Sequence, residues 1–309
     1  MIEARHLSKR YGATQAVDDL SFSVEAGQVT GFLGPNGSGK STTMRMIVAL
    51  DAPTSGMVTV GGRAYGSLRF PLHEVGALLD ANAAHPGRRA RNHLNWLADS
   101  NKIPRSRVDE VLGIVGLADA AHRRAGELSL GMGQRLGIAA ALLGNPEVLI
   151  LDEPINGLDP EGILWVRHLL RSLADEGRTV LVSSHLMTEM ALTADHLIII
   201  GRGRLLSSGP VADFIERSGG HHVKVVTPDA EALTVLLRDK GATVAVDAPQ
   251  DLSVEGLESR DVGILAAGAG LTLYELSTQR ASLEDAFMEL TREHAEYRGT
   301  TEPAEAIPA

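Results

Sequence analysis

The sequence predicts an α/β fold for most of the chain and a smaller α+β domain at its C-terminal end. Short apolar runs alternate with helical patterns up to about residue 210, and such runs fit the strands of a sheet covered on both faces. Beyond residue 218 the predicted elements are smaller and follow a different order. At roughly 150 residues per domain, a chain of 309 residues is long enough for both domains.

Four apolar runs are the predicted strands of the first domain, which we place at 1–218. They are 29–33, 148–151, 179–182 and 196–200. Helical patterns lie between them, for example at 42–50 and behind Asp159-Pro160, which is a good N-cap and first-turn pair. This strand–helix alternation is typical of a layered α/β domain.

The segment from about 88 to 144 is predicted to be helical throughout and to form a subdomain inserted into the α/β domain. Three sets of apolar residues at helical spacing support this interpretation. They are Leu94, Leu97 and Ala98; Val108, Val111, Leu112 and Val115; and Leu136, Ala140 and Leu143.

The second domain is predicted at 219–292, where the order β-α-β-β-α-β resembles a split βαβ, ferredoxin-like unit. Strands are expected at 222–227, 242–247, 251–254 and 271–276, and helices at 230–239, 260–267 and 282–290. Ser207–Pro210 is interpreted as a turn, and 218–220 as the linker between the domains. The polar stretch 293–309 is expected to be disordered.

Composition excludes several classes of function. The chain has no cysteine, which rules out a disulfide framework, a thiolate zinc site and a cysteine nucleophile. Its formal charge of −10 argues against nucleic acid as a partner, because nucleic-acid binders usually carry a basic footprint. The uncharged stretch 262–274 is shorter than the roughly 20 residues of a spanning helix. The N-terminus lacks an apolar signal-peptide core, so we expect a cytosolic protein.

The strongest functional signal is the segment Gly34-Pro35-Asn36-Gly37-Ser38-Gly39-Lys40-Ser41, which matches the phosphate-binding pattern G-x-x-x-x-G-K-[ST]. A predicted strand precedes it and a predicted helix follows it, as the pattern requires. Glycines let the backbone wrap closely around phosphates, and a helix N-terminus favours their negative charge. Lys40 is expected to reach the β- and γ-phosphates, and the Ser41 hydroxyl is expected to ligate Mg²⁺. The alternative is a glycine-rich turn without a ligand.

Two carboxylates, Asp152 and Glu153, directly follow the apolar run 148–151. Ligands of parallel sheets bind at the carboxyl ends of strands. Asp152 is therefore placed to hold Mg²⁺, directly or through water, and Glu153 to take a proton from an attacking water. The alternative is that acidic residues simply end a strand.

A third cluster, Leu128-Ser129-Leu130-Gly131-Met132-Gly133-Gln134-Arg135, lies between these two motifs. With it, the chain resembles the ATP-binding subunit of an ABC transporter over about residues 1–218. The layout is similar to that of subunits from two-component exporters of drugs, antibiotics or lipids. The resemblance implies a P-loop NTPase (RecA-like) core, a Mg²⁺-dependent ATPase, and two partners: a second copy of the chain and a membrane permease. It also implies a peripheral location at the cytoplasmic face of the membrane.

The resemblance assigns roles at the nucleotide. Tyr11 matches the aromatic residue that stacks on adenine, and the phosphate loop extends to Thr42. His185 matches the histidine that senses the γ-phosphate, so Lys40, Glu153 and His185 are the expected catalytic residues. Tyr11 as a packed surface aromatic and His185 as an ordinary capping residue are the alternatives.

The resemblance also assigns roles between two copies. The family signature matches Leu128–Met132, in which Ser129, Gly131 and Met132 would contact the ATP held by the second copy. Asp159 matches the loop that joins the copies, although it also suits the cap of the next helix.

Two positions depart from the family pattern. The family usually has glutamine where this chain has Asp80, which is shorter and charged and is still able to bind Mg²⁺. Leu130 replaces the first glycine of the signature. Both changes bear on the turnover rate more than on nucleotide binding.

The rival function is a soluble ABC ATPase of translation or DNA repair. Translation types generally carry two ATPase modules in one chain, whereas this chain has one phosphate loop. Repair types insert a long coiled coil before the signature, and no sustained heptads occur here. A kinase with the same phosphate loop would leave the signature and His185 without a role.

Overall fold

The computed structural model describes residues 1–81, 83–217, 221–280 and 283–291. They form two compact units, a larger one over Met1–Val211 and a smaller one over Ala212–Glu289. The sequence pattern places the boundary after residue 218, whereas the smaller unit already includes most of helix α7 (Val211–Arg217). The predicted linker 218–220 and the predicted disordered stretch 293–309 lie outside the described residues.

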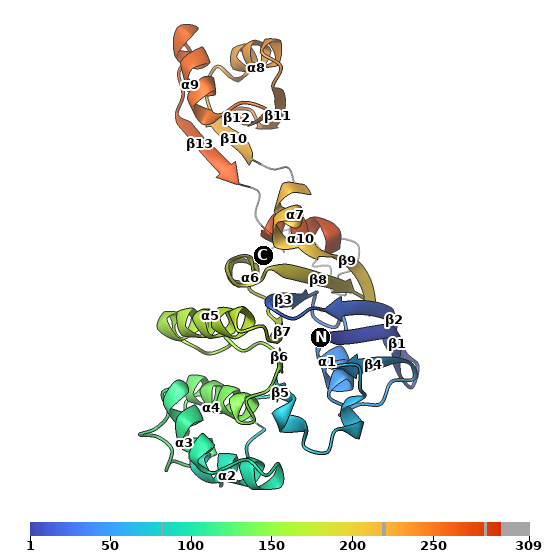
Figure 1. The fold of residues 1–309 in the computed structure, drawn as a ribbon. Coiled ribbons are helices and arrows are strands. Elements are labelled where there is room, and N and C mark those ends of the chain that lie inside the picture. The colour runs from blue at the N-terminus through green and yellow to red at the C-terminus, as the bar shows by residue number, and fades with distance from the viewer. Residues whose placement is uncertain (82, 218–220, 281–282, 292–309) are drawn as a thin grey trace, which may run out of the picture. The chain divides into compact units, whose positions relative to one another are not determined.

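The central sheet of the larger unit contains all four predicted strands. Its order is β5 (Val75–Leu78), β6 (Val148–Leu151), β7 (Thr179–Ser183), β3 (Gln28–Leu33), β8 (His196–Gly201) and β9 (Arg204–Pro210). The first five strands run parallel, and β9 pairs antiparallel with β8 (Figure 1). The carboxyl ends of the five parallel strands therefore meet at one edge of the sheet.

The turn predicted at Ser207–Pro210 is wrong. This segment belongs to β9, where Ser207 pairs with Ile199 of β8. The chain reverses earlier, at Arg202 and Gly203, both of which have positive φ. Glycine and proline are tolerated in an edge strand, because one side of it needs no ladder partner.

A second sheet packs with helix α1 (Lys40–Ile47) around the main core. It has the order β2 (Thr14–Val24), β1 (Ile2–Tyr11) and β4 (Ser55–Val60), all antiparallel. Ile2, Leu20, Phe32, Met44 and Ile198 are fully buried in one cluster that joins both sheets and α1. Burial of this apolar surface fixes the end of β3 against the start of α1, and the loop between them carries the phosphate-binding pattern.

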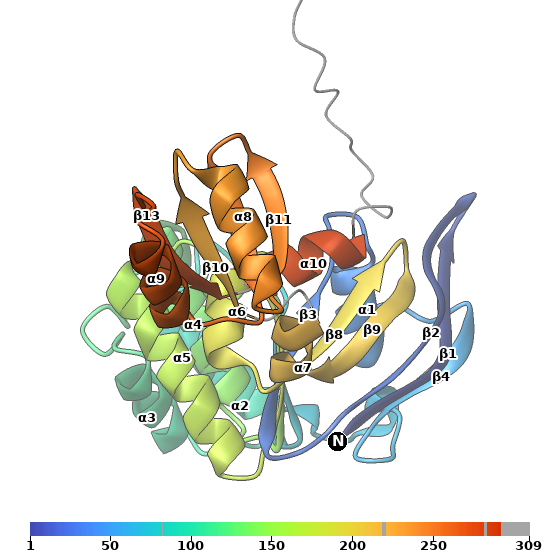
Figure 2. The same ribbon diagram turned by 90° about the horizontal axis from the view of Figure 1, so that it is seen from above.

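The segment around 88–144 is helical, as predicted. It contains α2 (Ala90–Ser100), α3 (Ser106–Ile114) and α4 (Leu130–Leu142), and α5 (Pro160–Asp175) and α6 (Met187–Thr193) follow in the α/β core. Single 3₁₀ turns occur at Tyr65–Ser67, Pro71–His73 and Ala125–Glu127. In Figure 2, α2, α3 and α5 lie at one side of the larger unit and the sheet of β1, β2 and β4 at the other. In the described part of the chain, no helix is both long and apolar enough to cross a membrane.

The smaller unit has the element order β-α-β-β-α-β. Its elements are β10 (His221–Val226), α8 (Ala230–Asp239), β11 (Thr243–Ala248), β12 (Asp251–Glu255), α9 (Ser259–Gly268), β13 (Glu275–Arg280) and then α10 (Leu283–Thr291). The antiparallel sheet has the order β11-β12-β10-β13. Val225, Leu237, Leu252 and Val262 are fully buried in its core.

The last strand of this sheet begins later than the sequence predicts. We expected it at 271–276, but it pairs with β10 only from Glu275 onward. Leu271 and Leu273 still pack, half-buried, against the core of this unit from the preceding loop. The apolar residues in this segment are therefore explained by packing against the core, and they do not indicate a strand.

Candidate functional site

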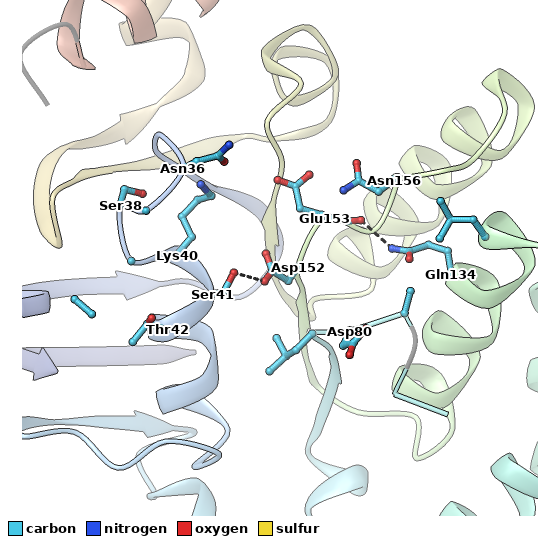
Figure 3. Close-up of a pocket in the computed structure, with 16 residues that line it drawn as sticks. Asn36, Ser38, Lys40, Ser41, Thr42, Asp80, Gln134, Asp152, Glu153 and Asn156 are labelled. Atoms are coloured by element: carbon cyan, nitrogen blue, oxygen red, sulfur yellow. Dashed lines mark hydrogen bonds between the residues drawn. The ribbon is translucent and has the colours of Figure 1, made fainter. Parts of the chain in front are cut away.

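A pocket of about 600 Å³ lies at the carboxyl ends of β3 and β6. One wall is the loop before α1 together with the first residues of that helix. The facing wall comes from the residues after β6, the residues after β5 and the start of α4 (Figure 3). It is lined by Ala16, Asn36, Gly37, Ser38, Gly39, Lys40, Ser41, Thr42, Leu79, Asp80, Ala81, Leu130, Gln134, Asp152, Glu153 and Asn156. Ligands bind at this edge of parallel sheets, and the pocket size suits a nucleotide.

Glycines are required in the loop that forms the first wall. Gly39, at the N-cap of α1, has φ +100, and a Cβ there would come within 2.5 Å of the Ala16 carbonyl oxygen. A Cβ at Gly34 would lie 2.4 Å from the Ile200 carbonyl oxygen. The chain thus holds a tight loop that ends directly in a helix N-terminus, where unpaired N–H groups favour an anion.

Lys40 spans this loop from the first position of α1. Its Nζ donates hydrogen bonds to the carbonyl oxygens of Gly34 (2.6 Å) and Pro35 (3.1 Å). Burial lowers the pKa of Lys40, and the nearby Glu153 and Asp152 carboxylates oppose that shift. The Lys40 side chain thus lies beside the helix N-terminus, and its ammonium and the N–H groups there would both favour an anion.

Asp152 joins the two walls. Ser41 Oγ donates a hydrogen bond to Asp152 Oδ2 at 2.7 Å, and Ser183 Oγ donates to Asp152 Oδ1. Sequence reasoning brought Ser41 and Asp152 together as metal ligands, and the structure places them in contact. It did not single out Ser183, whose position at the end of β7, beside His185, was the available signal.

Three side chains hold Glu153 in place. Its N–H donates to Ser183 Oγ (3.0 Å), its carbonyl oxygen accepts from Gln134 Nε2 (2.8 Å), and its Oε2 lies 2.8 Å from His185 Nδ1. The carboxylate is about a quarter exposed. A partly buried carboxylate fixed beside an imidazole, across the pocket from a phosphate-attracting loop, is suited to general-base chemistry.

The donor set fits a magnesium ion. Ser41 and Asp152 supply a hydroxyl and a carboxylate, and Asp80 lines the same pocket. Mg²⁺ prefers oxygen ligands and binds through one or two carboxylates together with water and substrate phosphates. Among the described residues, no group of three or more His, Cys, Asp or Glu side chains is arranged to hold a metal ion.

The structure does not bring the whole signature into this pocket. Leu130 lines it, whereas Ser129, Gly131 and Met132 do not. Ser129 Oγ accepts a hydrogen bond from the Met132 N–H and caps α4, and a Cβ at Gly131 would lie 2.9 Å from the Gly157 carbonyl oxygen.

Tyr11 and Asp159 also lie outside the lining of the pocket. The Tyr11 hydroxyl donates to Asp51 Oδ2 at 2.9 Å, and about half of this residue is exposed. Asp159 accepts a hydrogen bond from the Gly162 N–H (2.9 Å) and caps α5, so its alternative role as a cap is confirmed.

Comparison with known families gives two matches. Residues 17–156 match the ABC transporter family, and residues 221–284 match a family described as a domain of unknown function.

Relatives match over nearly the whole length of the chain. An uncharacterized ABC transporter ATP-binding protein of Bacillus subtilis, YhcH, is 36% identical over 96% of this chain and 97% of its own. The bacitracin transport ATP-binding protein BcrA of Bacillus licheniformis is 36% identical over 94% and 97%. A Nod factor export ATP-binding protein I of Burkholderia lata is 34% identical over 94% and 96%.

Two solved structures resemble the larger part of the chain. The ATP-binding subunit of an ABC transporter superposes with a TM-score of 0.65 and 25% identity, covering 71% of this chain and 93% of that one. A dimeric bacterial ABC transporter cassette superposes with a TM-score of 0.64 and 25% identity, covering 68% and 99%.

Proposed function

Since this chain belongs to the ABC transporter family as an ATP-binding subunit, we propose that it hydrolyses Mg²⁺-ATP in the pocket of Figure 3 and thereby powers export by a separate membrane permease. The observation that best supports this proposal is that the phosphate loop and the end of β6 face each other across one pocket. Lys40 and Ser41 come from the phosphate loop, and Asp152 and Glu153 come from the end of β6. Phosphoryl transfer needs charge stabilisation on one side of the phosphate and a positioned water on the other.

The loop wall binds the triphosphate. N–H groups at the start of α1 and the Lys40 ammonium are placed to contact the β- and γ-phosphates. Asn36, Gly37, Ser38, Gly39 and Thr42 line the remainder of this wall, and Gly34 and Pro35 shape the loop. We propose that Tyr11 stacks on adenine. Its ring is about half exposed and so open to a ligand, and the hydrogen bond to Asp51 holds its hydroxyl in place.

Ser41 and Asp152 hold the magnesium ion, with Asp80 as a third oxygen donor from the end of β5. When bound, the ion neutralises charge on the phosphate oxygens. Ser183 Oγ donates a hydrogen bond to the other oxygen of the Asp152 carboxylate, Oδ1. The carboxylate is thereby held in one orientation.

Glu153 acts as the base that takes a proton from the attacking water. His185 holds the Glu153 carboxylate through Nδ1, and we propose that it senses the γ-phosphate from there. The proton moves from water to the carboxylate as the water oxygen attacks the γ-phosphorus, and ADP leaves.

Two copies close on two ATP molecules, each held between the phosphate loop of one copy and Ser129, Gly131 and Met132 of the other. The position of these signature residues outside the pocket of their own chain supports this arrangement. A structurally similar cassette is dimeric, and Gly157 and Leu158, which precede Asp159, lie against Gly131 of the signature. Contacts made only in the closed state would drive closure.

The permease holds the subunit at the cytoplasmic face of the membrane. The described helices supply no span of their own. Relatives named for bacitracin transport and Nod factor export match almost end to end, and we propose that the cargo is likewise a drug, an antibiotic or a lipid. Transport subunits that match over 94% of this chain also favour this function over a soluble ATPase of translation or repair.

Glu153→Gln tests the base assignment in the full-length chain. We expect ATP turnover to fall by about 100-fold or more, because general-base catalysis is worth that much, while ATP binding persists. Glu147→Gln, an exposed position just before the same strand, is the control and should keep wild-type turnover. Undiminished turnover in Glu153→Gln would show that the base is another group.

A further inference from the structure

We propose that Gln134 is a positioning residue of the ATPase reaction: its side-chain amide holds the main chain of Glu153 in the conformation that presents the carboxylate to the substrate. This inference rests on the proposed role of Glu153 as the base. It concerns one hydrogen bond, from Gln134 Nε2 to the Glu153 carbonyl oxygen, at 2.8 Å (Figure 3).

The backbone of Glu153 is in an unfavourable conformation. Its φ is +51, in the left-handed region where a Cβ crowds the following carbonyl. Seven non-glycine residues have positive φ in the described part of the chain, and Glu153 is the only one of them that lines the pocket. Such a conformation persists only where the surroundings hold it, and at a functional site it aims a side chain.

Four residues hold Glu153 through hydrogen bonds. Three of them come from nearby parts of the α/β core: Ser183 Oγ accepts the Glu153 N–H, the Asn156 N–H donates to the carbonyl at 3.2 Å, and His185 holds the carboxylate. The fourth, Gln134, comes from α4 in the helical subdomain. Because φ and ψ determine where the Cβ points, a donor fixed on the carbonyl limits the directions open to the carboxylate.

Gln134 is itself firmly placed. It is 3% exposed and lies on α4 among the buried residues Leu136, Ile138 and Ala139. A buried amide costs free energy unless it is hydrogen-bonded, and an apolar residue of the same size would pack here without that cost. The amide instead donates to the main chain of Glu153, which is the proposed base and the one non-glycine pocket residue with positive φ.

The same helix carries the signature. α4 begins at Leu130, with Ser129 as its cap, and Gln134 follows about one turn later. A shift of α4 when the signature engages ATP on a second copy would therefore act directly on the Glu153 carbonyl. The Gln134 hydrogen bond connects the helix that carries the signature to the main chain of the proposed base in the same chain.

Gln134→Met and Gln134→Glu, which introduce side chains of similar size, test the Gln134 Nε2 donor. Gln134→Met removes the donor and leaves a buried side chain in its place. We expect kcat of the full-length chain to fall about tenfold, equal to about 1.4 kcal/mol of transition-state stabilisation, with KM for ATP nearly unchanged. Asn101→Leu is the control, because it removes a buried amide that donates to the Leu97 carbonyl, accepts from the Leu72 N–H and does not line the pocket. It should lower the melting temperature in the same way but leave kcat unchanged.

Gln134→Glu adds a pH-dependent readout at the same position, in the pocket that Gln134 lines together with Lys40, Asp152 and Glu153. Burial raises the pKa of the introduced carboxyl group, which donates to the carbonyl only while protonated. The ratio of variant to wild-type kcat should therefore fall as the pH rises, and taking the ratio removes the titrations that both proteins share. A wild-type kcat in Gln134→Met, or a ratio independent of pH, would overturn the inference. If Glu153→Gln kept its turnover, the assignment of Glu153 as the base and this inference would both fail, while ATP hydrolysis itself would stand. Inactive Glu153→Gln beside fully active Gln134→Met would overturn only this inference.

Discussion

Lys40 shows at the scale of one residue how folding changes the pKa of a side chain. The unfolded chain keeps the Lys40 proton up to about its ordinary pKa of 10.5, and burial lowers that pKa in the folded chain. Between the two values the unfolded state binds more protons, so the Lys40 contribution to folding stability rises with pH there. ATP binding responds in the opposite sense, because the ammonium that attracts the phosphates is lost.

We therefore predict that the affinity for Mg²⁺-ATP weakens with rising pH before the ordinary lysine pKa is reached. Titration calorimetry between about pH 7 and about pH 10 measures it in the wild type and in Lys40→Arg. The arginine stays charged over this range, so its affinity, although weaker overall, should not show the alkaline decline. The same alkaline decline in both proteins would assign it to a group other than Lys40.

At the same scale, sequence patterns identify the residues that face a ligand better than the residues that hold them. Lys40, Ser41, Asp152 and Glu153 stand in motifs with a chemical rationale, and the structure gathers them around one pocket. Ser183 is a side chain that acts on Asp152 and Glu153 through hydrogen bonds made across the sheet. Such contacts depend on which strands become neighbours, and sequence spacing does not state that.

Gly39 shows at the scale of elements why the junction of β3 and α1 tolerates so little change. In Gly39→Ala, the new Cβ would have to adopt φ +100 and would lie 2.5 Å from the Ala16 carbonyl oxygen of β2. The left-handed conformation alone costs about 1–2 kcal/mol, and the close contact adds to it. The loop, the start of α1 and β2 therefore have to shift together.

We predict that Gly39→Ala abolishes measurable ATP binding and lowers the free energy of unfolding by more than the conformational cost alone. Gly177→Ala is the control, because Gly177 has φ +89 and no atom beyond its chain neighbours lies within 4 Å of its Cβ position. Equilibrium urea unfolding and ATP binding, measured on both variants, separate conformational cost from steric cost. Equal losses of stability with ATP binding intact in Gly39→Ala would show that the loop can relax.

Apolar periodicity predicts a helix or strand well where the local composition agrees with it. It predicts less well where local composition and sheet pairing favour different structures. The buried strands β3, β6, β7 and β8 are apolar runs flanked by helical patterns, and each lies where it was expected. Ser207–Pro210 has turn composition but lies in the edge strand β9, because pairing with β8 outweighs local preference. At 271–276, apolar residues pack from a loop, and the strand starts where hydrogen bonding to β10 begins.

At the scale of the whole molecule, the site of Figure 3 is half of the proposed ATP site. The pocket contains the phosphate loop and the proposed base, but Ser129, Gly131 and Met132 of the same chain do not line it. A composite site predicts that two inactive variants can repair each other if each is damaged in a different half. Lys40→Ala damages the loop, and Gly131→Asp sets a carboxylate against the partner's phosphates.

In a heterodimer of these two variants, one site combines the intact loop of the Gly131→Asp chain with the intact signature of the Lys40→Ala chain. The other site combines both defects. If the sites act independently and the copies pair at random in a closed twofold dimer, an equal mixture should recover about a quarter of wild-type ATP turnover. Each variant alone should show almost none, and circular dichroism should confirm that both are folded. For sites that act independently, a mixture no more active than its components would place the signature and the phosphate loop of one chain on the same ATP, and the second copy would then have no part in the site.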